Sequence, residues 1–386
     1  MLSPFTREAD KVANPQKTVF GSNFSSDYKF IHHKIKRYRL LLKTKLTIIF
    51  MENKSFKFEI EDSEKYIVSK IYKPTKIPTQ ILYHKIFIEN ANNNSAGYVI
   101  KEQCGKGGAS VVYKGVIKDT DETIIIKELK TNNLYKVKRE VNILKLCKNI
   151  PNIIKLLDFF VNDDCYYLLF PYYNCNSTRT IFYNFTQIEI KIFMKKFLEA
   201  LEKLHKKGII HRDLKPGNIL VKSCSDFYII DFGISDFYIP HRKFDTKLGT
   251  RNFKAPEQLI NIKGFDYGID IWSSGLIFAE IYFGKYPFWK PDEDIIILEN
   301  IHNLVGTDKF NEFITQYKTD GEYPFLKNRV EPANLETYFE RKASDSIRNN
   351  TEENKKAFDL IGKMLEIDPR KRITAHDALK HPYFAN

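Results

Sequence analysis

Hydrophobic and polar positions follow two different patterns in two parts of the chain. Between residues 98 and 169, short runs of β-branched and aromatic residues alternate with polar turns, which is typical of strands. One stretch interrupts them, because Val137, Val141 and Leu144 recur at helical spacing. The pattern therefore predicts strands with a single helix among them, followed after residue 171 by mostly helical structure.

The helical part contains a long amphipathic run at residues 188–207. Five of its positions are predicted to point into the core: Ile192, Phe193, Phe197, Leu201 and Leu204. A β-rich half followed by an α-rich half predicts an α+β fold of two lobes, a small one at 98–170 and a large one at 174–384. The polar stretch at about 305–353 is predicted to be an insert on the large lobe.

Two segments precede the strands. Residues 1–50 carry ten Lys or Arg and three Asp or Glu, out of a net charge of +13 for the chain, and are predicted to form a basic, disordered tail. A nuclear signal or a patch that faces DNA or phosphate at 32–39 is the alternative interpretation of this tail. Residues 51–97 are predicted to be an extension that ends in an Asn-rich linker. Since the excess charge lies mainly in the tail, no direct nucleic-acid binding is expected of 98–384.

Composition narrows the class further. The five cysteines form no Cys-x-x-Cys pair, which argues against a zinc site and favours a reducing intracellular compartment. No apolar run reaches the roughly 18 residues of a transmembrane helix, so no membrane association is expected.

The stretch at 211–218 carries the clearest chemical signal. It reads His-Arg-Asp-Leu-Lys-Pro-Gly-Asn, and His-Arg-Asp-x-x-x-x-Asn is the catalytic-loop motif of protein kinases. In such a loop Asp213 would accept the proton of the attacking hydroxyl, and Asn218 would hold Mg²⁺. Lys215, two residues after the Asp, resembles the Lys with which Ser/Thr kinases steady the transferred phosphate.

Companion motifs occur in the expected order. Asp231-Phe232-Gly233 follows an apolar run, as expected of a strand that delivers an Asp to a metal bound to phosphate. Upstream, Lys127 ends a buried β run, and Glu140 lies on the predicted helix. The resemblance implies that Lys127 and Glu140 form an ion pair that directs the Lys to the nucleotide phosphates, and that Asp231, like Asn218, holds Mg²⁺.

A glycine-rich loop precedes these residues. Such a loop alone could belong to a dinucleotide-binding fold, but strand-like residues follow it here, whereas that fold requires a helix. A β-hairpin over the phosphates of ATP fits better. Its predicted contacts are Gly105, Lys106, Gly107, Gly108, Ala109, Ser110 and Val112.

The adenine is predicted to bind at 170–173. The motif order makes Phe170 the gatekeeper, and the Pro171 carbonyl and the Tyr173 amide would then bond the base. Ile125 stands where kinases usually place Ala, so the added bulk is expected to crowd the purine.

Two further motifs resemble structural parts of kinases. Asp270, at the start of a predicted helix, would anchor the catalytic loop. Arg372 would pair with Glu257, the Glu of the Ala-Pro-Glu triplet.

Charge near the predicted phosphoacceptor site suggests a substrate class. Arg251 and Lys254 lie where the residue after the phosphoacceptor should bind, and cations there favour Asp, Glu or a phosphorylated residue. The alternative is that these cations pair with a phosphorylated activation segment. Thr246, four residues before Thr250, resembles an activating phosphothreonine, with Arg212 as its expected partner.

Several of these motifs together resemble the cell division control protein seven kinases, the catalytic subunits of the DDK complex. They are the glycine loop ending in Ser110, the Pro171-Tyr172 hinge, and the stretches 249–257, 269–273 and 284–288. The resemblance implies phosphorylation of Ser/Thr beside acidic or phosphorylated residues in the MCM replicative helicase, and an activating regulatory subunit. It also implies a nuclear location and a role in DNA replication and the cell cycle. Another Ser/Thr kinase, casein kinase 2-like or cyclin-dependent-like, and a pseudokinase scaffold are the alternatives.

Overall fold

A computed structural model describes residues 97–131, 133–162, 165–175, 178–290, 293–317, 319, 321–333 and 352–385. The predicted tail at 1–50 lies outside the described residues, as do 51–96 and the 334–351 part of the predicted insert.

The small lobe is a five-stranded antiparallel sheet with the order β1-β2-β3-β5-β4. Its strands are β1 (Tyr98–Lys106), β2 (Ser110–Ile117), β3 (Thr123–Leu129), β4 (Asp158–Asn162) and β5 (Cys165–Pro171). Side chains alternate across β3, so Ile124 and Ile126 are fully buried in one cluster while Lys127 points to the opposite face.

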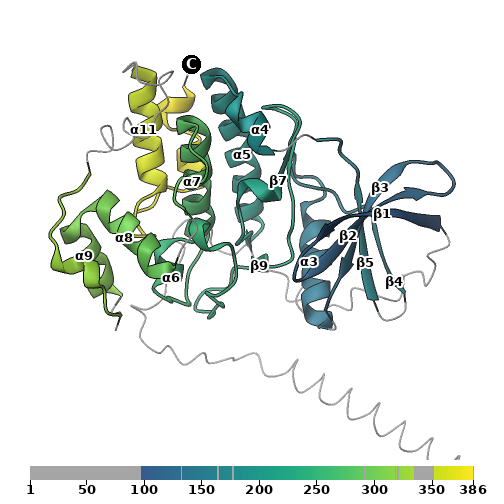
Figure 1. The fold of residues 1–386 in the computed structure, drawn as a ribbon, viewed down its shortest axis with the longest axis horizontal. Helices are drawn as coiled ribbons and strands as arrows, with labels where there is room; N and C mark the ends of the chain where they lie inside the picture. Colours follow the sequence, from purple (N-terminus) through teal and green to yellow (C-terminus); the bar gives the residue numbers. More distant parts are fainter. Residues whose placement is uncertain are drawn as a thin grey trace, which may run out of the picture. The chain divides into compact units, whose positions relative to one another are not determined.

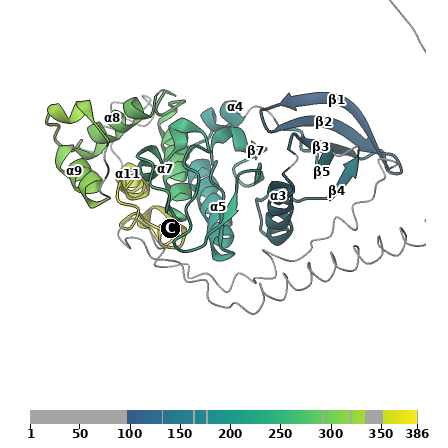
Figure 2. The same ribbon diagram turned by 90° about the horizontal axis from the view of Figure 1, so that it is seen from below.

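One helix, α3 (Leu134–Cys147), lies against this sheet (Figures 1 and 2). It begins at Asn133, whose side-chain oxygen accepts bonds from the backbone N–H groups of Tyr135 and Lys136. Val137, Val141 and Leu144 form its buried apolar face, and Glu140 is buried beside them.

The large lobe is mainly helical. Its helices are α4 (Thr178–Tyr183), α5 (Gln187–Lys206), α6 (Pro256–Leu259), α7 (Gly268–Phe283), α8 (Asp294–Val305), α9 (Thr307–Gln316), α11 (Glu352–Met364) and α12 (Ala375–Ala378). Short 3₁₀ turns occupy Pro216–Asn218, Arg251–Phe253, Pro324–Lys327 and Pro382–Phe384. Every residue of α7 after Gly268 is buried, so this helix forms the centre of the lobe (Figure 1).

Two small two-stranded sheets position the catalytic segments. β6 (Ile209–Ile210) pairs with β9 (Asp236–Phe237), and β7 (Ile219–Val221) pairs with β8 (Phe227–Ile229). β6 immediately precedes the His-Arg-Asp run, β8 ends just before the Asp-Phe-Gly run, and β9 follows it.

The structure confirms the predicted α+β fold of two lobes. It corrects one core residue, because Ile192 is 38% exposed. The inward face of α5 runs through Phe193, Phe197 and Leu201, and Ile192 shares the outer edge with Ile188, four residues earlier. Among the described residues, no helix has the length and apolar character needed to cross a bilayer.

Candidate active site

A cavity of about 190 Å³ opens between the two lobes. Val112, Ile125 and Phe170 line it from the sheet, and Leu220 and Phe232 line it from the large lobe. Lys127, Glu140, Asn218 and Asp231 add charged and amide groups to these apolar walls. Apolar walls with a few convergent polar groups are typical of ligand sites.

Lys127 joins both lobes at this cavity. Its Nζ donates to Glu140 Oε1 at 2.8 Å and to Asp231 Oδ1 at 2.8 Å. Burial would lower the pKa of Lys127, but the charges of Glu140 and Asp231 outweigh burial and raise it. Likewise, burial would raise the pKa of Asp231, and Lys127 more than offsets this and holds it low. Both groups therefore stay charged at neutral pH.

Backbone geometry lets these three charges meet. Asp231 adopts a positive φ of 62°, an uncommon conformation for a residue with a side chain. Next to it, a Cβ at Gly233 would lie 3.3 Å from Asp231 Oδ1 and 3.6 Å from Glu140 Oε2. The Gly of the Asp-Phe-Gly run thus leaves room for the carboxylates beside Lys127.

A second network gathers around Asp213. The Asn218 amide nitrogen donates to Asp213 Oδ2 at 3.0 Å, and Lys215 Nζ lies 2.9 Å from the same oxygen. Thr250 donates to Asp213 Oδ1 from its backbone N–H at 2.8 Å and from its hydroxyl at 2.7 Å. Lys215 Nζ donates to the Thr250 hydroxyl at 2.5 Å.

Asp270 on α7 holds the catalytic loop through hydrogen bonds to its backbone. This fully buried carboxylate accepts the backbone N–H groups of His211 at 2.8 Å and Arg212 at 2.9 Å. Arg212 has a positive φ of 73°, and these two bonds hold the loop in that conformation. Asp270 therefore anchors the loop as its motif predicted.

Asn218 and Asp231 fit a magnesium ion. The Asn218 nitrogen bonds Asp213, which leaves the amide oxygen for a cation. No cluster of three or more His, Cys, Asp or Glu suited to a metal occurs within the described ranges. A cation here would thus take two protein side chains and complete its shell with phosphate and water oxygens, as Mg²⁺ does in nucleotide sites.

The predicted nucleotide contacts divide into two groups. Ser110, Val112, Lys127, Glu140 and Pro171 line the cavity, and Ile125 also lines it, in register with Phe170. The rest lie outside its walls: Gly105, Lys106, Gly107, Gly108, Ala109 and Tyr173. The glycine loop forms the predicted hairpin, because Gly107 N–H donates to Ser110 O at 2.9 Å between β1 and β2. Tyr173 stacks its ring on Tyr228, with the centroids 4.0 Å apart.

One of two expectations about the activation segment, that Lys254 meets substrate, was wrong. Unphosphorylated Thr246 is 5% exposed, and its hydroxyl donates to Asn261 Oδ1 at 2.6 Å; its phosphorylation and the pairing of that phosphate with Arg212 stay predictions. Arg212 donates to the carbonyls of Ile234 and Asp245. Lys254, expected to meet substrate, is 8% exposed and donates to the Lys247 carbonyl at 3.0 Å. Spacing along the chain does not reveal burial.

Sequence reasoning missed some residues that the structure brings to the site. Thr250 bonds Asp213 across 37 positions, and Ile154 and Ile230 line the cavity. The only sequence signal for Thr250 was its place in the segment that precedes Ala-Pro-Glu. Burial of the two isoleucines depends on the packing of distant strands.

Comparison with known proteins agrees with this geometry. The protein kinase domain model matches residues 98–384. A probable serine/threonine-protein kinase of Dictyostelium discoideum is 31% identical over 324 residues, which cover 82% of this chain and 52% of the relative. The chain thus spans about half the length of that relative. With a family match over most of its length, the chain belongs to the protein kinase family.

Proposed function

We propose that the protein is a Ser/Thr protein kinase that transfers the γ-phosphoryl group of ATP to protein substrates. One observation carries the proposal. Lys127 bonds both Glu140 and Asp231 at the cavity. Asn218 lines the same cavity and hydrogen-bonds Asp213. ATP and Mg²⁺ are the cofactors that a protein kinase domain implies.

Asp213 would orient the substrate hydroxyl and accept its proton. The Asn218 amide and the Thr250 hydroxyl bond its two oxygens and thereby fix the carboxylate. Lys215, 2.9 Å from the carboxylate, would offset negative charge that develops on the transferred group. All of these groups belong to this chain.

The nucleotide would enter between the glycine hairpin and the large lobe. Its phosphates would meet Lys127, which is held in place by Glu140. When bound, Mg²⁺ neutralises phosphate charge, and Asn218 and Asp231 are the residues that would hold it. Because the phosphate-binding Lys and both magnesium residues are present together, the site supports a catalytic kinase over a pseudokinase.

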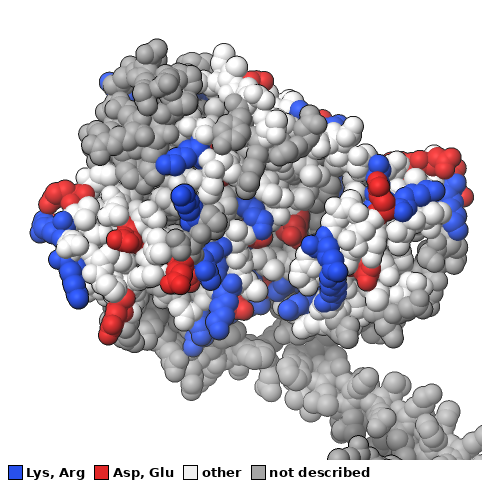
Figure 3. Space-filling model, viewed as in Figure 1, with Lys and Arg blue, Asp and Glu red and all other residues white. Residues whose placement is uncertain are grey.

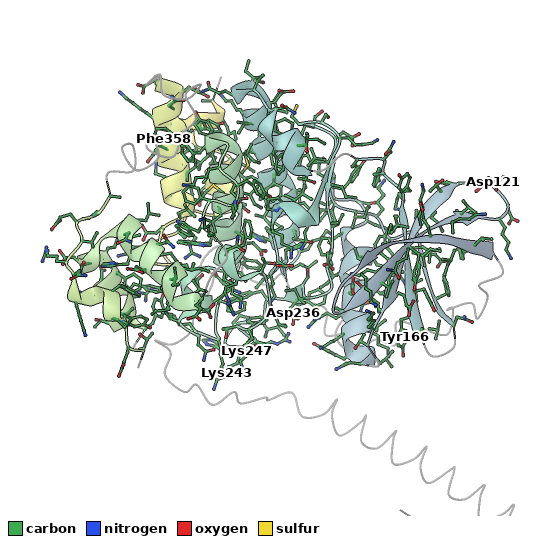
Figure 4. All side chains as sticks on the ribbon, in the orientation of Figure 1. Asp121, Tyr166, Asp236, Lys243, Lys247 and Phe358 are labelled. Carbon is green, nitrogen blue, oxygen red and sulfur yellow. The ribbon has the colours of Figure 1, made fainter. Side chains whose placement is uncertain are left out.

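A preference for acidic or phosphorylated neighbours of the target residue is supported by Arg251. Its side chain is 56% exposed and its Nε lies 3.0 Å from Asp294 Oδ1, also about half exposed, so a substrate anion could replace this partner. Further exposed cations, Lys243 and Lys247, precede it in the same segment (Figure 4). In Figure 3, Lys and Arg groups lie over much of the face in view, its lower part included, with Asp and Glu groups among them.

The narrower assignments rest on the subfamily resemblance. They are the MCM helicase as substrate, an activating regulatory subunit, a nuclear location and a role in DNA replication, and they stay predictions. A casein kinase 2-like kinase is the second candidate, since an exposed Arg251 would favour acidic substrates there too. A cyclin-dependent-like kinase stays an alternative from sequence.

The test is phosphate transfer from labelled ATP, with Mg²⁺, into three Ser peptides that differ in the next residue: Asp, Ala or Pro. We expect the Asp peptide to be preferred, and Asp213→Asn to lower kcat by roughly 10²- to 10⁴-fold. Arg251→Gln should reduce only the preference for Asp. A preference for Pro would favour the cyclin-dependent alternative, and binding of ATP without transfer into any peptide or protein would favour the scaffold.

A further inference from the structure

Three arginines from three separate segments converge on one carboxylate, that of Asp236 in β9. Arg139 of α3 donates to Oδ2 at 2.9 Å. Arg242, which follows β9, makes a bidentate contact: its two terminal nitrogens donate to Oδ1 at 2.9 Å and to Oδ2 at 3.0 Å. Arg212 of the catalytic loop lies 3.9 Å from Oδ2. Asp236 is labelled in Figure 4, near the junction of the two lobes.

This cluster is buried and carries excess positive charge. The side chains of Asp236 and Arg212 are 2% and 3% exposed, and that of Arg139 is 10% exposed. Burial lowers the pKa of Arg212 to about 10, Asp236 opposes this shift, and Arg139 and Arg242 add to it. Arg242 is less buried, at 29% exposed. Guanidinium groups this close repel one another unless an anion lies among them, so the cluster needs this carboxylate.

The same cluster touches each part of the catalytic apparatus. Arg139 directly precedes Glu140 on α3, and its second nitrogen donates to the Gly233 carbonyl at 3.3 Å. One turn of the helix is therefore tied to β9 through Arg139 and to Lys127 through Glu140. On the other side, Arg212 directly precedes Asp213.

The anion that these arginines contact is a side chain of the protein itself, the carboxylate of Asp236. In many switchable proteins an Arg cluster gains its anion only by phosphorylation. The nearest candidate acceptor by sequence, Thr246, is buried and bonded to Asn261. Asp236 occupies the position among the arginines without any modification.

We propose that Asp236 is a positioning residue, whose carboxylate holds α3 and the activation segment in the arrangement that pairs Lys127 with Glu140, without phosphorylation of that segment. This inference rests on the proposed kinase function. Beyond that function, it assigns the maintenance of the active arrangement to Asp236 and predicts that phosphorylation of the activation segment is not needed.

Chemical rescue of Asp236→Ala tests the proposal. Removing the carboxylate leaves a space among three guanidinium groups that a formate ion can enter. We expect kcat to fall by roughly tenfold to a hundredfold, as misplaced catalytic groups cost. Sodium formate should restore part of it, whereas sodium chloride at equal concentration should not. A side chain that only stabilised the fold would give no formate-specific recovery.

Hydrogen exchange of the peptide 134–147 gives a readout that is independent of phosphate transfer. Exchange of α3 should rise in Asp236→Ala and fall again with formate. If the wild-type chain binds ATP but transfers no phosphate, the scaffold alternative is favoured, while this readout still tests whether Asp236 holds α3. The matched control is Asp308→Asn, an exposed carboxylate on α9 whose ion-pair partner Arg329 is also exposed, and it should match the wild type in both measurements.

Three results would overturn the proposal. The first is a wild-type kcat in Asp236→Ala, or a reduced one that formate and chloride change equally. The second, decisive if Asp236→Ala fails to fold, is Arg139→Gln with wild-type kcat and wild-type exchange of α3. The third is a wild-type protein that loses activity on phosphatase treatment and regains it when its activation segment is phosphorylated again.

Discussion

Buried carboxylates in the large lobe differ mainly in their partners. Asp270 is fully buried and accepts two backbone N–H bonds, and Glu257 is fully buried against Arg372. Asp266 is 8% exposed, and its carboxylate accepts the Gly268 N–H at 2.8 Å. Burial raises the pKa of Asp266 from 3.8 to about 7. The bond from Gly268 and the nearby charge of Arg372 lower the pKa, but they cancel only part of the effect of burial.

The raised pKa of Asp266 predicts a pH-dependent stability. As pH rises from about 4 to about 7, the unfolded chain loses this proton before the folded chain does, so the free energy of unfolding falls. Asp266→Asn keeps an oxygen for the Gly268 N–H and removes the titration. We expect the variant to gain stability relative to the wild type across this window, by at most roughly 1.4 kcal/mol per pH unit.

Denaturant unfolding of both proteins at pH 5 and pH 8 measures this difference. The gain should be larger at pH 8 and constant at higher pH. An equal difference at both pH values would show that Asp266 does not titrate in this window.

Single residues also show what a sequence motif can predict and what it cannot. Asp213 and Lys127 could be assigned from sequence because each lies at a fixed place in a short local pattern. Lys254 had an equally clear position, yet its ammonium group lies inside and bonds the Lys247 carbonyl. A motif gives the type and order of side chains, but not which of them water reaches.

At the scale of elements, α7 and the segments around it are joined by one buried ion pair. Arg372 donates to both oxygens of Glu257 at 2.8 and 3.0 Å, and both side chains are fully buried. It also donates to the Gly268 carbonyl at the start of α7, and its guanidinium lies 5.1 Å from the Trp272 ring centroid. The pair thus connects α6, α7 and the segment before α12.

Breaking this pair on one side should destabilise the large lobe strongly. Glu257→Gln leaves the Arg372 charge buried without its counterion, which typically costs about 3–5 kcal/mol. Arg329→Ala is the matched control, since its ion pair with Asp308 is largely exposed and should contribute about 0.2–1 kcal/mol. Urea unfolding compares the two, and equal losses would contradict the assigned role of the buried pair.

Elements were predicted from sequence with different success. The glycine hairpin, β3 and α3 followed from local alternation and spacing, which neighbouring residues determine. On α5 the length was predicted well, but Ile192 was wrongly assigned to the core. The edge of an apolar face depends on what packs beside it, and that element lies elsewhere in the chain.

At the scale of the whole molecule, the cavity depends on contacts between residues that are distant in sequence. Lys127 of β3 meets Asp231 across 104 positions, so both lobes contribute to one site. A nucleotide bound there would contact both lobes and should stabilise the folded state as a unit.

ATP with Mg²⁺ should therefore raise the melting temperature of the wild-type chain. At about 100 times Kd the expected stabilisation is about 2.7 kcal/mol. EDTA, or the variant Asp231→Asn, should reduce it, because the phosphates then lose their bound cation. Differential scanning fluorimetry provides the measurement, with Asp213→Asn as a control that keeps the metal residues and should retain the shift. An unchanged shift after removal of Mg²⁺ would contradict a metal role for Asn218 and Asp231.

The sequence by itself determined the two-lobed α+β fold and the chemical types and order of the groups at the site. Local periodicity specifies strands and helices, and short motifs specify residues a few positions apart. Tertiary structure alone decided that Thr250 bonds Asp213, that Lys254 is buried, and that three arginines share Asp236. Each of these depends on which distant segments exclude water from a side chain and supply its counterion, which no local pattern contains.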